Sequence, residues 1–125
     1  GRDRLTGGGG ADVFAFAATD SPAAAGRFDT VADFRPADRF DLPRLATDGV
    51  DYFESKVAAD GFGAAYDEAV RVMQAHDGGA VYVFVAGGTD GWLFADFDGP
   101  DTVPDFAVKL VGRSRVDHFD AGFIV

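Results

Sequence analysis

A glycine-rich segment near the start of the chain carries a repeated pattern that restricts the backbone more than any other part of the sequence. Residues 7–15 read Gly-Gly-Gly-Gly-Ala-Asp-Val-Phe-Ala, which matches the nonapeptide G-G-x-G-x-D-x-U-x, where U is a large apolar residue. Residues 1–6 fit the last six positions of the same unit. Glycine adopts positive φ angles readily, and the apolar residue of each unit, Leu5 and then Phe14, can point inward from a short strand. The pattern therefore predicts tight turns that alternate with short strands, and not a flexible linker.

The aspartate of each unit gives these turns a chemistry as well as a shape. Glycine turns let carbonyl oxygens crowd towards a cation, and aspartate adds a hard anionic oxygen of the kind that calcium prefers. The full nonapeptide is typical of a parallel β-roll, in which successive turns alternate sides and like-sided turns lie about eighteen residues apart. Asp20 is then the expected counterpart of Asp3, and Asp29 that of Asp12. The expected calcium ligands in this region are Gly1, Asp3, Gly8, Gly10, Asp12, Asp20 and Asp29.

A second acidic segment, Asp96-Phe97-Asp98-Gly99-Pro100-Asp101, has two acids at alternate positions followed by a glycine, as calcium loops do. Pro100 stands where such a loop needs a third oxygen donor, and no glutamate follows. Asp96, Asp98 and Asp101 are therefore weaker calcium candidates. A tight turn between two strands explains the same residues.

Charge limits the partners of the chain. Aspartate and glutamate number 21 against 11 lysines and arginines, for a formal net charge of −10. Nucleic acids and anionic lipids both require a basic face, so the charge argues against them and favours cations. Hydrophobic residues make up 47% of the chain, which contains no cysteine, no apolar run long enough for membrane insertion and no visible signal peptide.

Hydrophobic periodicity predicts a mainly-β chain with one short helix. Apolar residues at helical spacing place the helix at residues 64–75, and the turn Gly87-Gly88-Thr89-Asp90-Gly91 predicts a hairpin. Residues 43–62 read as irregular. The expected fold is a short parallel β-roll, with its last repeats at residues 1–17, that runs into a β-sandwich-like cap at residues 18–125. The expected strands are 13–17, 28–34, 39–42, 81–85, 92–95 and 106–111.

Several segments beyond the repeat coincide with one family. These are Asp-Thr-Val-Ala-Asp-Phe at 29–34, Asp-Arg-Phe-Asp-Leu at 38–42, Pro-Asp-Phe-Ala-Val-Lys-Leu-Val-Gly at 104–112, and an apolar C-terminus. Their order resembles the C-terminal region of serralysin-type metalloproteases and other repeats-in-toxin proteins. Members often end in an acidic residue followed by three apolar ones. Here Gly122 stands where the acid would be, and Asp120 is the nearest acid.

The resemblance implies a calcium-filled β-roll and an uncleaved C-terminal signal for the type I secretion apparatus, and hence an extracellular protein with a further domain upstream. It also places Asp38 and Asp41, together with Asp33, beside the last turn of the roll. Asp38 or Asp41 could complete a calcium shell there, or all three could be surface turn carboxylates.

Catalysis within the chain is not expected. Its two histidines, His76 and His118, do not form a His-Glu-x-x-His pair, and no Gly-x-Ser-x-Gly elbow occurs. The sequence thus predicts a calcium-binding, non-enzymatic module of a secreted bacterial protein. The alternative is an adhesin, surface-layer or carbohydrate-binding module that uses calcium structurally.

Overall fold

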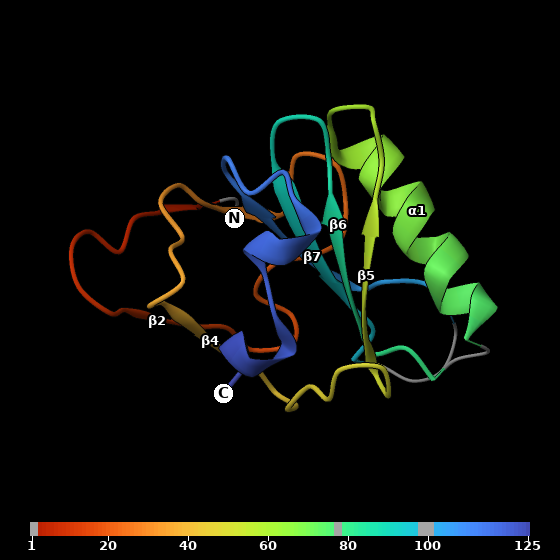
Figure 1. The fold of residues 1–125 in the computed structure, drawn as a ribbon, viewed down its shortest axis with the longest axis horizontal. Coiled ribbons are helices and arrows are strands. Elements are labelled where there is room, and N and C mark those ends of the chain that lie inside the picture. The colour runs from red at the N-terminus through yellow and green to blue at the C-terminus, as the bar shows by residue number, and fades with distance from the viewer. Residues whose placement is uncertain (1–2, 77–78, 98–101) are drawn as a thin grey trace.

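The computed structural model describes residues 3–76, 79–97 and 102–125, and most of its strands lie in one mixed sheet. The sheet runs in the order β1-β3-β8-β7-β6-β5, and β2 and β4 form a second, two-stranded sheet. Figure 1 shows α1 along one side of the large sheet and β2 and β4 on the side away from it. The elements are β1 (Arg4–Leu5), β2 (Val13–Ala15), β3 (Asp29–Val31), β4 (Arg39–Asp41), β5 (Tyr52–Lys56), α1 (Phe62–Ala75), β6 (Tyr82–Ala86), β7 (Gly91–Ala95), β8 (Phe106–Leu110) and the 3-10 turns η1 (Val116–His118) and η2 (Ala121–Phe123).

The expectation of a mainly-β chain with one short helix is confirmed. The predicted hairpin is also confirmed, because β6 and β7 pair antiparallel, as do β7 and β8. Residues 43–62 are not irregular throughout, however, since β5 lies within them and pairs with β6 in parallel. The predicted cap therefore contributes strands to a single mixed sheet. The parallel neighbours β5 and β6 are joined through α1, which provides the crossover connection that parallel strands require.

The helix covers one face of the large sheet. Its inward residues recur at helical spacing, as the sequence predicts, and Ala65, Ala69, Val72 and Met73 are all buried. Small alanines let α1 approach the sheet closely, and Trp92 and Phe94 of β7 complete this core. Burial of these apolar groups, and not helix propensity, provides most of the stability of a helix of this length.

An aromatic core fills the other face and contains the end of the chain. Phe119 is 2% exposed, and its ring centroid lies 5.3 Å from that of Phe84 and 5.8 Å from that of Phe40. Ile124 forms a bridge to Phe40, and the Val125 amide donates to the Phe40 carbonyl at 2.7 Å. The C-terminal residues thus extend the edge of β4 (Figure 1).

The first four strands alternate between the two sheets, and we call residues 3–41, which contain them, the N-terminal coil. Arg4 of β1 pairs with Thr30 of β3, and Val13 of β2 pairs with Arg39 of β4, both in parallel. Stacked positions are thus 26 residues apart, as they also are in the hydrogen bond from the Asp3 amide to Asp29. The expected spacing of about eighteen residues is wrong for these strands.

The extra length of the coil lies in the loop between β2 and β3. The Ser21 hydroxyl, which is fully buried, donates to the Ala107 carbonyl of β8 and accepts the Asp29 amide at 2.7 Å. The Ala107 amide in turn donates to the Ser21 carbonyl at 3.0 Å. The loop is therefore attached to β8, and its additional residues allow the chain to reach that strand.

Candidate functional site

Carboxylates of the second half of the N-terminal coil hold the backbone of the first half. Asp29 accepts the amide of Asp3 at 2.8 Å, Asp33 accepts the amides of Gly7 and Gly8, and Asp38 accepts the amide of Asp12 at 2.9 Å. A bond to a charged acceptor is about twice as strong as one between neutral groups. These aspartates therefore fix the turns of the first half in place.

The glycine turn is shaped by its own residues and by Asp33. Gly8 and Gly10 have φ angles of 79° and 83°, in the left-handed region that the repeat predicts for its glycines. The two oxygens of Asp33 lie 2.9 and 2.8 Å from the amides of Gly7 and Gly8. These two bonds stabilise the charged form, so they hold the pKa of Asp33 below its usual value. The resemblance placed Asp33 beside the last turn but did not indicate its bonds to Gly7 and Gly8, although its spacing of 26 from Gly7 equals that of Asp29 from Asp3.

Asp12 carries an unused acceptor in the same turn. Its backbone is fixed through Asp38, but its Oδ2 is buried and has no hydrogen-bond partner among the described residues. A Cβ added at Gly7 would lie 2.5 Å from this oxygen, so the carboxylate is packed against the glycine backbone. A buried carboxylate oxygen without a donor is costly unless a cation or a donor reaches it.

The N-terminal coil also contains an acidic cavity. Asp3, Asp20 and Asp29 line one cavity of about 390 Å³, together with Leu5, Ala15 and Phe16. Asp29 is only 4% exposed, and burial is the main reason that its pKa is raised, with the charges of Asp3 and Asp20 adding to the shift. Like charges in one cavity disfavour ionisation, so a cation there would relieve the repulsion.

The predicted ligand pairs are only partly brought together. Asp3 and Asp20 share the cavity as predicted, whereas the prediction that Asp12 faces Asp29 is wrong, because the register places Asp38 beside Asp12 and Asp29 beside Asp3. Both carboxylate oxygens of Asp38 accept backbone amides.

The remaining candidates lie apart from these turns or outside the description. Asp41 is exposed on β4, and Asp96 is 6% exposed just after β7. Gly1, Asp98 and Asp101 lie outside the described residues. Within the described ranges, no group of three or more acidic, histidine or cysteine side chains is arranged to hold a metal ion. A calcium ion in these turns would therefore need backbone carbonyls as well as aspartate.

Among the described residues, no helix is long and apolar enough to cross a membrane. The His76 ring stacks on Phe53 at a centroid distance of 3.6 Å, and His118 lies in η1. Glu54 accepts the Tyr52 hydroxyl at 2.9 Å, and burial raises the pKa of both groups.

No known protein family, curated protein or solved structure matches the chain. The candidate site is defined by the glycine turn and the aspartates of the N-terminal coil.

Proposed function

We propose that the chain is a calcium-binding C-terminal module of a secreted bacterial protein, and that its N-terminal coil is the last part of a calcium-filled β-roll. The observation that carries the proposal is the Asp12 carboxylate, which presents a buried, unpartnered oxygen within a turn of positive-φ glycines. Calcium takes six to eight oxygen ligands and accepts carboxylate and carbonyl oxygens together. A glycine turn with one free carboxylate oxygen matches that preference.

The two ends of the coil differ in a way that supports a capping role. On the downstream side, β8 pairs with β3, and the chain end bonds to Phe40 of β4. On the upstream side, β1 and β2 are edge strands of their sheets, and the acidic cavity lies between them. Further coils of a roll would add to β1 and β2, while the rest of the chain covers the last coil. Terminal units of repeat proteins protect the core in this way.

The proposed mechanism begins with repulsion between carboxylates. Without calcium, the charges of Asp3, Asp20 and Asp29 oppose one another and weaken the coil. Calcium, which is abundant outside cells, neutralises them and stabilises the folded state. The gain is RT ln(1 + [L]/Kd), about 2.7 kcal/mol at a hundredfold excess over Kd.

Export by a type I secretion apparatus is part of the same proposal. Phe119 and Ile124 belong to the aromatic core, and Val125 is hydrogen-bonded to Phe40. A signal in this segment is accessible only before the chain folds, so delayed folding in low calcium keeps it available. The proposal assigns no catalytic step to this chain and places any enzymatic activity in an upstream domain.

A thermal melt followed by circular dichroism tests calcium binding. The chain is melted with excess chelator, with millimolar calcium and with millimolar magnesium. We expect a calcium-specific rise in Tm that Asp12→Asn removes, since this change keeps the shape of the side chain but not its charge. The matched control is Asp67→Asn, which changes the same charge at an exposed position of α1 and should keep the rise.

Coincident melting curves in calcium and chelator would reject the calcium site. An equal response to magnesium would reject its selectivity. A calcium response that Asp12→Asn leaves intact would reject the turn as its location. If the calcium response holds but the C-terminal segment does not direct export, the alternative of a surface-layer or adhesin module with structural calcium is favoured.

A further inference from the structure

The helix α1 covers only part of the large sheet. The helix packs against β5, β6 and β7, whereas β8, β3 and β1 continue the same face beyond it. A helix with its side chains is about 10 Å wide and strands lie about 4.8 Å apart, so one helix cannot cover six strands. The face formed by β8, β3 and β1 therefore lies beyond the helix.

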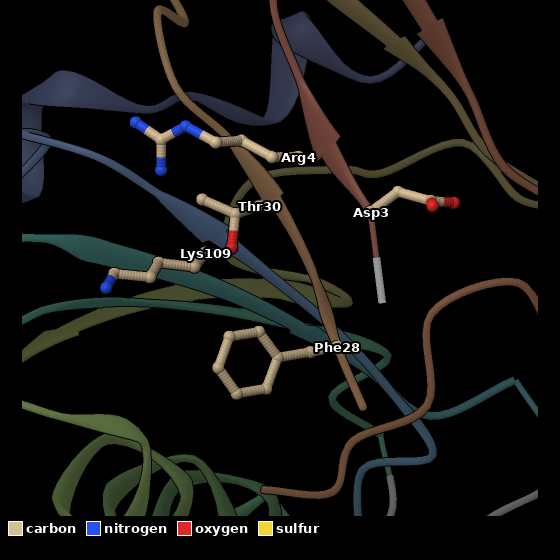
Figure 2. A pocket seen from close by; sticks show the side chains of 5 residues that line it. All are labelled: Asp3, Arg4, Phe28, Thr30 and Lys109. Carbon is tan, nitrogen blue, oxygen red and sulfur yellow. The ribbon is translucent and has the colours of Figure 1, made fainter. Parts of the chain in front are cut away.

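Side chains of these three strands form a row across this face. Arg4 of β1 pairs with Thr30 of β3, and Thr30 pairs with Lys109 of β8. Residues paired across a sheet point to the same face, so all three side chains stand on the face that α1 partly covers. Figure 2 shows them on one side, with the Asp3 carboxylate pointing away from them. They line a cavity of about 280 Å³ together with Phe28 and Asp3.

An aromatic ring forms the apolar wall of this cavity. Phe28 stacks on Phe62 at a centroid distance of 5.2 Å and an interplanar angle of 9°, and it meets Trp92 edge-on at 4.9 Å. These contacts fix the ring, while its partial burial leaves part of it accessible. The cavity therefore combines a fixed apolar surface with polar side chains, which is typical of sites for small ligands.

Both basic groups of the cavity are available to an anion. Arg4 is exposed and forms no ion pair within the described ranges. Lys109 Nζ lies 5.6 Å from the centroid of the Trp92 ring and 3.5 Å from Asp90 Oδ2. Trp92 and Asp90 thus position the ammonium group, which has three N–H donors and can still bond an anion. Two basic groups on either side of Thr30 are notable on a chain with a net charge of −10.

We propose that this cavity binds an acidic sugar, a single pyranose ring that carries a carboxylate. The C–H face of the ring packs on Phe28, and the Thr30 hydroxyl bonds a ring hydroxyl. Arg4 and Lys109 receive the carboxylate through charge-assisted hydrogen bonds. The surrounding negative charge of the protein makes these two cations the determinant of where the anion binds. The site lies on the face of the sheet opposite the aromatic core, and it adjoins the acidic cavity of the coil, because Asp3 lines both.

Isothermal titration calorimetry of the whole chain in millimolar calcium tests the proposal. The probe is a galacturonate tetramer, and maltotetraose is the uncharged control ligand. Free galacturonic acid, titrated separately, should also bind, because the cavity is proposed to take one ring. We expect binding of the acidic tetramer, weaker binding at high salt, and none of the neutral one. Arg4→Gln and Lys109→Gln should each lower the affinity about tenfold, the effect of one hydrogen bond to a charged group.

Lys56→Gln is the matched control, because Lys56 is exposed on β5 at the opposite edge of the same sheet and should not affect binding. Phe28→Leu keeps apolar bulk in the core and should weaken binding through the lost ring. Circular dichroism confirms that each variant is folded. The proposal is overturned if the acidic tetramer does not bind, if both tetramers bind equally, or if Lys56→Gln is as damaging as Arg4→Gln.

Discussion

Substitution of Asp38 tests whether this aspartate supports the backbone of the N-terminal coil or binds a metal ion. It is fully buried, and its two oxygens accept the amides of Asp12 and Arg35, each at 2.9 Å. Asp38→Ala leaves both amides without this acceptor. A buried polar group that loses its partner costs about 1–3 kcal/mol, but Arg35 is exposed and water can reach its turn. We therefore expect a loss of about 2–4 kcal/mol in the free energy of unfolding.

For a chain of 125 residues, this loss corresponds to a fall in Tm of about 8–15 °C. Urea unfolding at pH 7 measures it, once with excess chelator and once with calcium. Asp41→Ala is the matched control, because Asp41 is exposed on β4, three residues after Asp38, and should change stability by less than about 0.5 kcal/mol.

The two metal conditions separate the two roles of Asp38. If the carboxylate supports the backbone, the loss persists in chelator, since the two amides are orphaned with or without calcium. A loss that vanishes in chelator would show instead that Asp38 acts through a bound ion. Equal effects of Asp38→Ala and Asp41→Ala would refute the backbone-acceptor argument altogether.

Three further changes have expected outcomes. Gly7→Ala places a methyl group 2.5 Å from Asp12 Oδ2, so it should displace the carboxylate and abolish the calcium-dependent rise in Tm while the chelated protein still melts cooperatively. Phe119→Ala empties the centre of the aromatic core and should cost about 3–5 kcal/mol in urea unfolding, with Phe119→Leu less harmful; equal stability of wild type and Phe119→Ala would contradict this packing. In chelator, the dependence of the free energy of unfolding on acidic pH should distinguish Asp33 from Asp29. Relative to Asp33→Asn, the wild type should lose stability as pH falls below about 3.9, because the folded pKa of Asp33 is lowered. Relative to Asp29→Asn, the wild type should gain stability as pH falls through the folded pKa of Asp29, because that pKa is raised. If the two stability differences changed with pH in the same direction, both pKa assignments would be contradicted.

Local patterns predicted the parts of the fold in which neighbours in sequence are also neighbours in space. The buried face of α1, with Ala65, Ala69, Val72 and Met73, follows from helical periodicity alone. The hairpin of β6 and β7 follows from a glycine-rich turn between two apolar runs. Strand β5 was missed because three of its five residues, in the sequence Tyr-Phe-Glu-Ser-Lys, are polar. A helix followed by a buried strand was the available signal, since it is typical of a parallel β-α-β unit.

The glycine turn of the candidate site was predicted, but the pairing of its aspartates was not. The repeat correctly indicated positive-φ glycines at Gly8 and Gly10. It could not indicate which aspartates stack, because the spacing of 26 depends on a loop that is attached to β8 through Ser21. That attachment is a contact between residues 86 positions apart, and no local pattern reports it.

The sequence by itself determined the glycine turns, the acidic character of the coil, the helix and the hairpin, because each depends on backbone preferences or periodicity within a short window. Only the tertiary structure decided that Asp38 is held between two amides, that Asp12 keeps a free oxygen, and that Arg4, Thr30 and Lys109 form one row. These arrangements arise from the register of strands distant in sequence, which is set by packing the whole core.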